Sequence, residues 1–143
     1  MKYDCLSLDR QLCFPIYAVS HLITKKYKPF LDEIGLTYTQ YITMMVLWER
    51  NSISVKELGS ILHLDSGTLT PLLKRLEKKG LLTRQRSEED ERLLIVSLTS
   101  EGILLQEKAH TIPSQMGKCI PLNQNEAHEL YKLLYKILDS MEE

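Results

Sequence analysis

The sequence of 143 residues predicts a mainly α-helical fold with a small β-wing, an α+β arrangement. Three observations predict it. Residues 55–62 and 66–79 place apolar side chains at helical spacing with a turn between them, and two short segments, 82–86 and 93–98, follow around a polar loop. Helical patterns also precede and follow this central unit. The order helix, turn, helix, hairpin is that of a winged helix-turn-helix.

The first predicted helix follows Asp9, which we expect to cap it, and extends to about residue 26. Its expected buried residues are Phe14, Tyr17, Ala18 and Leu22. Because Pro15 would remove a hydrogen bond from a helix that begins at Asp9, the helix either starts nearer Gln11 or is kinked. Residues 27–30 should continue into a short helical turn that ends at Gly35.

Two capping-box pairs open the next helices. Thr37 with Gln40 predicts a helix over 38–50, and Ser54 with Glu57 predicts one over 55–62. The core candidates of the first are Tyr41, Met44, Met45, Leu47 and Trp48. Those of the second are Val55, Leu58 and Ile61.

The basic helix that follows has two distinct faces. Asp65, or Ser66, is its expected N-cap. An apolar stripe is formed by Leu69, Leu72, Leu73 and Leu76. The opposite face carries small and hydroxylic residues first and cations later: Gly67, Thr68, Thr70, Pro71, Lys74, Arg75 and Lys78.

That second face is typical of a helix that enters the major groove of DNA. Small residues let the backbone approach the bases, hydroxyls can bond base edges, and cations can meet phosphates. The predicted DNA-binding residues of this helix are Ser66, Gly67, Thr68, Thr70, Pro71, Lys74 and Arg75. An ordinary amphipathic helix with a solvated basic face is the alternative.

The predicted hairpin supplies further cations. Gly80 should end the basic helix, and Arg84 and Arg86 share one face of the first strand because side chains alternate. At the tip, Asp90 could hold the guanidinium of Arg92 in a fixed pose for a narrow minor groove. A solvated charged turn is the alternative.

Two more helices complete the chain. Thr99 should cap one that extends to about residue 118 with an interruption near Pro113, and Asn123 with Glu126 should open the last. The last helix has a wide apolar stripe: Ala127, Leu130, Leu133, Leu134, Ile137, Leu138 and Met141. We expect a symmetric dimer formed by the first and the last two helices to bury it; packing on the same domain is the alternative.

Charge is unevenly distributed. The net charge is −1, but residues 66–86 contain six cations and one acid, which suits a nucleic-acid partner. Apolar runs are too short for a membrane span and no signal-peptide core follows the N-terminus, so we expect a cytoplasmic protein. Three cysteines and four scattered histidines show no metal-ligand spacing, and we expect neither metal nor cofactor.

Residues 65–77 and 86–92 together resemble the MarR family of bacterial transcriptional regulators, and most of all its organic-hydroperoxide-sensing OhrR type and the related staphylococcal thiol-based regulators. The resemblance extends from about Gln11 to Pro113. It implies a single MarR-type domain over 1–143, with dimerisation helices at 9–35 and 99–143 and a DNA-binding lobe at 37–98. It also implies a homodimer, expected to be a repressor, on a pseudo-palindromic operator.

Cys13 is the candidate redox sensor. A cysteine on an apolar helix face is by itself most often inert. Tyr17 lies one turn on, however, and Tyr27 could approach if the chain turned near residues 28–29; phenols that donate hydrogen bonds stabilise a thiolate. The resemblance implies that Cys13 senses organic hydroperoxide with Tyr17 and Tyr27 as its partners. It further implies resolution by Cys119 of the other subunit, with Cys5 or a low-molecular-weight thiol as alternatives.

Two other functions compete with redox sensing. A MarR-type regulator that responds to a small phenolic or lipophilic effector would bind it between the dimerisation and DNA-binding parts, and Cys13 would be structural. An enzyme such as a thiol peroxidase would need a base near its cysteine, and the sequence has neither that arrangement nor a glycine-rich phosphate loop. We therefore expect no enzyme.

Overall fold

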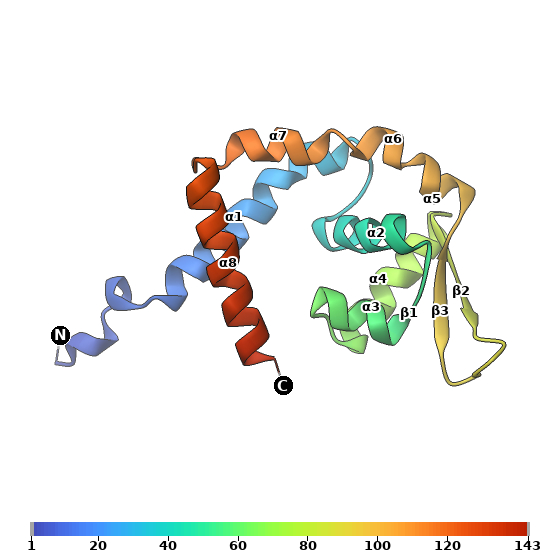
Figure 1. The fold of residues 1–143 in the computed structure, drawn as a ribbon, viewed down its shortest axis with the longest axis horizontal. Helices are drawn as coiled ribbons and strands as arrows, with labels where there is room; N and C mark the ends of the chain where they lie inside the picture. Colours follow the sequence, from blue (N-terminus) through green and yellow to red (C-terminus); the bar gives the residue numbers. More distant parts are fainter. Residues whose placement is uncertain (1, 143) are drawn as a thin grey trace. The chain divides into compact units, whose positions relative to one another are not determined.

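A computed structural model describes residues 2–142, and the chain divides into two compact units, Met1–Ile112 and Pro113–Glu143 (Figure 1). The helices of the first unit are the short 3₁₀ turns η1 (Asp4–Leu6) and η2 (Leu8–Arg10), α1 (Cys13–Asp32), α2 (Tyr38–Arg50), α3 (Val55–Leu62), α4 (Ser66–Lys78), α5 (Ser100–Leu104) and α6 (Gln106–Ala109). Its strands are β1 (Ser52–Ser54), β2 (Leu82–Arg86) and β3 (Leu94–Leu98). Helix α7 (Ile112–Cys119) begins at the last residue of this unit, and α8 (Gln124–Met141) follows.

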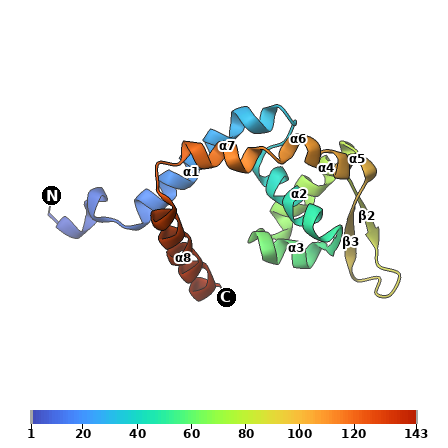
Figure 2. The ribbon, with the colours of Figure 1, turned by 45° about the horizontal axis from the view of Figure 1, so that its top comes forward.

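The winged helix-turn-helix is present. Helices α2, α3 and α4 gather beside an antiparallel sheet in the order β1-β3-β2, and the β2–β3 hairpin projects away from them; Figure 2 shows the same arrangement in a turned view. The core between helices and sheet is almost fully buried and includes Met44, Leu47, Leu58, Leu76 and Val96. The predicted fold class is therefore confirmed.

Most of the predicted caps form. Thr37 and Gln40 make both bonds of a capping box, and Asp65 Oδ1 accepts from the backbone N–H of Thr68 at 2.8 Å. Ser54 caps α3 alone, since the carboxylate of its expected partner Glu57 binds Arg50 at 2.7 Å. Each cap satisfies a backbone donor that the first helical turn leaves free. The predicted ranges of α2 and α3 match the structure because these caps define their starts.

Gly80 ends α4 as predicted. Its φ of +80° is the left-handed conformation that glycine adopts without a steric penalty. The N–H of Gly80 donates to the carbonyl of Glu77, and that of Leu81 donates to the carbonyl of Leu76, which is the Schellman pattern. The chain therefore reverses sharply from α4 into β2.

Helix α1 begins later than a cap at Asp9 predicts and close to the alternative start near Gln11. Asp9 lies in η2 and caps nothing, and α1 begins at Cys13 with Leu12 as its N-cap. Pro15 is then the third residue, in a turn whose amides need no helical partner, so it causes no kink. The helix also continues through Pro29 to Asp32, because the loss of one amide donor is local and Leu31, 2% exposed, anchors the following turn.

Several predicted core residues are exposed. Phe14, Tyr17 and Leu22 lie on the open surface of α1, and Ala18 is half-buried, because the described chain holds nothing that covers this side. Met45 and Ile61 are also exposed, since the buried faces of α2 and α3 are narrower than their apolar patterns; Trp48 and Val55 are half-buried. The buried stripe of α4, by contrast, matches the prediction at all four leucines.

The region predicted as one helix after Thr99 is divided into α5, α6 and α7. Thr99 caps α5 by accepting from the N–H of Gly102 at 3.0 Å. The last break falls just before Pro113, which is the second residue of α7, a place where proline is tolerated. Asn123 and Glu126 form the predicted capping box of α8, and every described side chain of α8 is exposed. Over residues 2–142, no helix is both long and apolar enough to cross a membrane.

Candidate nucleic-acid interface and cysteine site

The predicted recognition face of α4 is open. Ser66, Gly67, Thr68 and Pro71 are exposed in its first turns, and Thr70 is half-buried. The side chain of Asp65 accepts from the amide of Thr68, and this bond holds the pKa of the Asp65 carboxyl below its usual value. The turn that carries the small and hydroxylic residues is therefore fixed before any ligand binds.

Three exposed cations follow along α4, and a fourth lies on β2. Lys74, Arg75 and Lys78 on α4 and Arg86 on β2 are exposed, and none of the four side chains makes a hydrogen bond or ion pair with another described residue. Unpartnered cations on the side of a helix away from the core can meet phosphates without first breaking an internal contact.

Arg84 is different, although it shares a strand face with Arg86. Its guanidinium donates to Glu77 Oε1 at 3.1 Å and 3.3 Å, and its backbone N–H donates to Glu77 Oε2 at 3.0 Å. The alternation of side chains along the strand identified the face but not this partner. Glu77 is thus the structural residue that the sequence reasoning missed; the signal available was an acid and an arginine on either side of a glycine reversal.

The tip of the hairpin holds one arginine in a defined pose. Arg92 donates from Nε to Asp90 Oδ1 and from a terminal nitrogen to Asp90 Oδ2, each at 3.0 Å. Ser87 Oγ accepts from the amides of Glu89 and Asp90, which closes the turn. The Arg92 side chain is 90% exposed, and its guanidinium lowers the pKa of the Asp90 carboxyl. The predicted Asp90–Arg92 contact is therefore present.

Comparison with known proteins agrees with this geometry. The family model "Transcriptional regulator SarA/Rot" matches residues 25–112. The organic hydroperoxide resistance transcriptional regulator of Bacillus subtilis is 48% identical over 98% of this chain and 95% of its own length. The chain belongs to the SarA/Rot family of MarR-type transcriptional regulators. Its relatives are DNA-binding regulators rather than enzymes, so the thiol peroxidase alternative is excluded.

Solved structures of another MarR-type regulator, AbfR of Staphylococcus epidermidis, cover nearly the whole chain. Reduced AbfR bound to DNA is 36% identical with a TM-score of 0.81, over 99% of this chain and 96% of AbfR. Disulfide-formed AbfR has a TM-score of 0.61 at 36% identity, over 94% of this chain and 89% of AbfR. A protein of this family has thus been observed both on DNA and with a disulfide.

The three cysteines of this MarR-type regulator are free and exposed. Cys13 is the first residue of α1, where the helix dipole favours negative charge. Tyr17 lies one turn further along α1 and packs edge-on against His21, with ring centroids 4.5 Å apart. Cys119 is the last residue of α7, and its thiol donates to the carbonyl of Gln115 at 3.5 Å.

Tyr27 does not approach Cys13 within the chain. The two residues lie fourteen positions apart on one continuous helix, which corresponds to about 21 Å at the helical rise. Tyr27 instead packs with Tyr38 and Tyr41, with ring centroids 4.9 and 5.7 Å away, and burial raises its pKa. The turn near Lys28 and Pro29 on which that approach depended does not form, because α1 continues through both residues.

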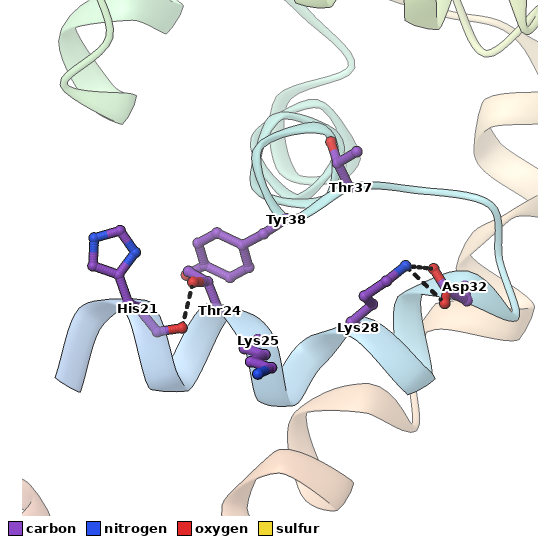
Figure 3. Close-up of a pocket in the computed structure, with 7 residues that line it drawn as sticks. All are labelled: His21, Thr24, Lys25, Lys28, Asp32, Thr37 and Tyr38. Atoms are coloured by element: carbon purple, nitrogen blue, oxygen red, sulfur yellow. Dashed lines mark hydrogen bonds and ion pairs between the residues drawn. The ribbon is translucent and has the colours of Figure 1, made fainter. Parts of the chain in front are cut away.

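A cavity of about 460 Å³ lies between α1 and the start of α2 (Figure 3). Lys28 is paired with Asp32 at 3.1 Å, and Thr24 donates to the carbonyl of His21 at 3.0 Å. Tyr38 supplies an aromatic wall. The lining is mixed rather than apolar, and polar pairs already occupy part of it. Among residues 2–142, no group of His, Cys, Asp and Glu side chains could hold a metal ion.

Proposed function

We propose that this chain is a redox-sensing regulator that binds inverted-repeat DNA as a homodimer and releases it when organic hydroperoxide oxidises Cys13. The observation that carries the DNA-binding part is the exposed face of α4. It combines a capped, small-residue first turn with cations that have no partner in the described chain. Thr68 and Thr70 would read base edges, and Lys74, Arg75 and Arg86 would contact phosphates.

The dimer would be formed by residues 9–35 and 99–143. Apolar side chains on α1 and along all of α8 are exposed in the single chain, including Phe14, Leu22, Leu134 and Ile137. An apolar face that is exposed along a whole helix, as on α8, indicates an interaction site. A second copy of the chain is its natural partner here, since a two-fold dimer presents two recognition helices to two half-sites.

A dimer also offers a place for Tyr27. Because Tyr27 is remote from Cys13 in the same chain, only Tyr27 of the partner subunit could donate to the Cys13 sulfur. Two α1 helices that cross in opposite directions would bring the start of one near the later turns of the other. Tyr17, on the same face as Cys13, would be the second donor. Both phenols would stabilise the thiolate that reacts with the peroxide.

The chemistry needs no cofactor. The Cys13 thiolate attacks the terminal oxygen of the hydroperoxide, the O–O bond breaks, and the alkoxide leaves as the alcohol after it takes a proton; Cys13 becomes a sulfenic acid. A second thiol then forms a disulfide with Cys13 and water is released. That thiol is Cys119 of the partner subunit, Cys5, or a low-molecular-weight cellular thiol. The new bond would shift the dimer helices and change the spacing of the recognition helices.

Non-reducing electrophoresis after cumene hydroperoxide treatment tests the resolving thiol. A cross-linked dimer in the wild type that is lost in Cys119→Ser supports Cys119, and Cys5→Ser is the matched control that should still cross-link. A dimer that persists in Cys119→Ser eliminates Cys119 as the partner. Mass spectrometry of oxidised Cys13 then identifies Cys5 or the small thiol.

The effector-binding alternative is favoured by one observation, the cavity between α1 and α2. A small phenolic carboxylate such as salicylate is a suitable probe, because Lys25 and His21 could meet its acid group and Tyr38 its ring. If salicylate releases DNA from reduced Cys13→Ser, and Tyr38→Ala abolishes that release, the regulator is controlled by a ligand at this cavity. Peroxide should have no effect in that case.

A further inference from the structure

Glu77 and Arg84 tie the recognition helix to the wing. Glu77 lies in the last turn of α4 and Arg84 at the centre of β2. Both oxygens of the Glu77 carboxylate are used: Oε1 accepts from the guanidinium at 3.1 and 3.3 Å, and Oε2 accepts from the backbone N–H at 3.0 Å. The Arg84 side chain is only 19% exposed. This contact therefore fixes both the side chain and the strand that carries it.

The pair extends a junction that is already rigid. Thr99 Oγ1 donates to the carbonyl of Gly80 at 2.6 Å, and the N–H of Thr99 donates to the carbonyl of Leu81 at 3.2 Å. Leu82, the first residue of β2, is buried. Arg84 lies two residues further toward the hairpin tip. Its bonds to Glu77 thus hold β2 to α4 at a second point, further along the wing.

Arg86 provides the contrast. It follows Arg84 by two residues and therefore lies on the same face of the strand. Its side chain is exposed and makes no hydrogen bond or ion pair with the rest of the described chain. Arg86 is free to meet a phosphate, whereas the Arg84 guanidinium would first have to give up both of its bonds to Glu77 Oε1.

We infer that Arg84 and Glu77 are positioning residues, which set the angle between the wing and α4, and that Arg84 does not contact DNA. The inference rests on the proposed DNA-binding function and assigns Arg84 a different part in it. Thr68 in the major groove and Arg92 in the minor groove must engage one duplex together. A wing at the wrong angle to α4 loses the Arg92 contact even though Arg92 itself is unchanged.

Salt dependence distinguishes positioning from contact. A phosphate contact contributes about 0.9 to the slope of log Kd against log salt, so its removal lowers the slope. Removal of a residue that acts only through the wing leaves the slope unchanged once the wing contact has already been lost. The probe is a duplex selected from a random pool by the reduced wild-type protein. Binding is measured by fluorescence anisotropy for Glu77→Gln, Arg84→Gln and the matched control Arg86→Gln, each checked for a cooperative thermal transition.

We expect Glu77→Gln and Arg84→Gln each to weaken binding by about five- to tenfold, as for a partly buried charged pair. Because both substitutions disturb the same contact, the double variant should bind DNA with the same affinity as the weaker-binding single variant. In an Arg92→Ala background neither change should weaken binding further, since the wing contact is already lost. In both single variants, the DNA should lose its protection from hydroxyl radicals at the minor groove that Arg92 would enter. Arg86→Gln should reduce the salt slope by about 0.9 in an otherwise wild-type chain.

A different result overturns the inference. If Arg84 contacted phosphate, Glu77→Gln would free its guanidinium and remove a nearby acid, so binding would be unchanged or tighter. A further loss from Arg84→Gln in the Arg92→Ala background would equally contradict a role through the wing. If a single variant does not fold, Arg84→Lys replaces it. Lysine keeps the positive charge but lacks the planar guanidinium, so the same loss of DNA affinity is expected. If the wild type selects no duplex at all, it is the proposed function that fails.

Discussion

At the tip of the wing, both carboxylate oxygens of Asp90 accept hydrogen bonds from the guanidinium of Arg92, each at 3.0 Å. A pre-formed pose of this kind suits insertion into the narrow minor groove of A/T-rich DNA. We predict that Arg92→Ala weakens binding about tenfold on a duplex with A/T-rich flanks and much less on one with G/C-rich flanks. Anisotropy titrations on the two duplexes measure this.

The neighbouring Glu91→Ala is the control for that experiment, because it removes a charged tip residue that has no part in the Arg92 pose. Its binding should keep the wild-type preference for A/T flanks. Equal affinity of Arg92→Ala and wild type on both duplexes would mean that the wing does not enter the minor groove.

Tyr27 and Cys13 give a second prediction. If Tyr27 acts on Cys13 of the other subunit, Tyr27→Phe should slow the reaction of Cys13 with cumene hydroperoxide by about tenfold, since one hydrogen bond to the thiolate is lost. Stopped-flow loss of free thiol measures the rate. Tyr38→Phe is the matched control within the same aromatic cluster and should react at the wild-type rate.

Mixed dimers test whether the pair forms between subunits. In a dimer of one Cys13→Ser chain and one Tyr27→Phe chain, the only Cys13 belongs to the Tyr27→Phe chain and the only Tyr27 belongs to the Cys13→Ser chain. With donation between subunits, that Cys13 meets the intact tyrosine of its partner and reacts at the wild-type rate. With donation within a chain, it has no tyrosine donor at that position and reacts slowly. The first result is expected, and the second would contradict the intersubunit arrangement.

The winged helix-turn-helix could be predicted from sequence because its signals are local. Thr37 and Asp65 specify helix starts through side-chain bonds to nearby amides, Gly80 ends α4 through its left-handed backbone, and the leucines of α4 follow one helical period. Strand β1 could not be predicted, since three residues are too few to show alternation and Ser52–Ser54 forms a strand only through pairing with β3. The partner of Arg84 likewise depends on how α4 and β2 meet. The exposure of Phe14, Tyr17 and Leu22 on α1 could not be predicted either. Their apolar spacing indicates a buried face, but they do not pack against other described residues of the chain.

The Asp65 cap gives a pH dependence. Bonds from the amide of Thr68 lower the pKa of Asp65, so the folded state favours the carboxylate. The stabilisation is fully present above the unfolded carboxyl value of about 4 and is lost as pH falls through the lower folded value. Asp65→Ala should thus lower the urea midpoint at pH 7, and its difference from wild type should narrow steadily below about pH 4. A difference that stayed constant down to about pH 2 would show that the cap does not depend on the charge.

The exposed apolar stripe of α8 predicts that this helix forms part of the interface of a homodimer. Leu134→Glu should convert the dimer to a monomer and abolish tight operator binding, because a charge buried in an apolar interface is strongly unfavourable. Glu129→Lys, which leaves the stripe intact, should remain dimeric. Sedimentation velocity distinguishes the two states. A dimeric Leu134→Glu protein that still binds DNA would place the dimer interface elsewhere.

The most direct test of the central claim is the affinity of the reduced protein for a selected duplex, measured before and after cumene hydroperoxide in the wild type and in Cys13→Ser. We predict tight binding by both proteins when reduced, release by the oxidised wild type in the presence of a small thiol, and retention of DNA by Cys13→Ser under the same treatment. Failure of the reduced wild type to bind any duplex, or equal release by Cys13→Ser, would contradict this claim.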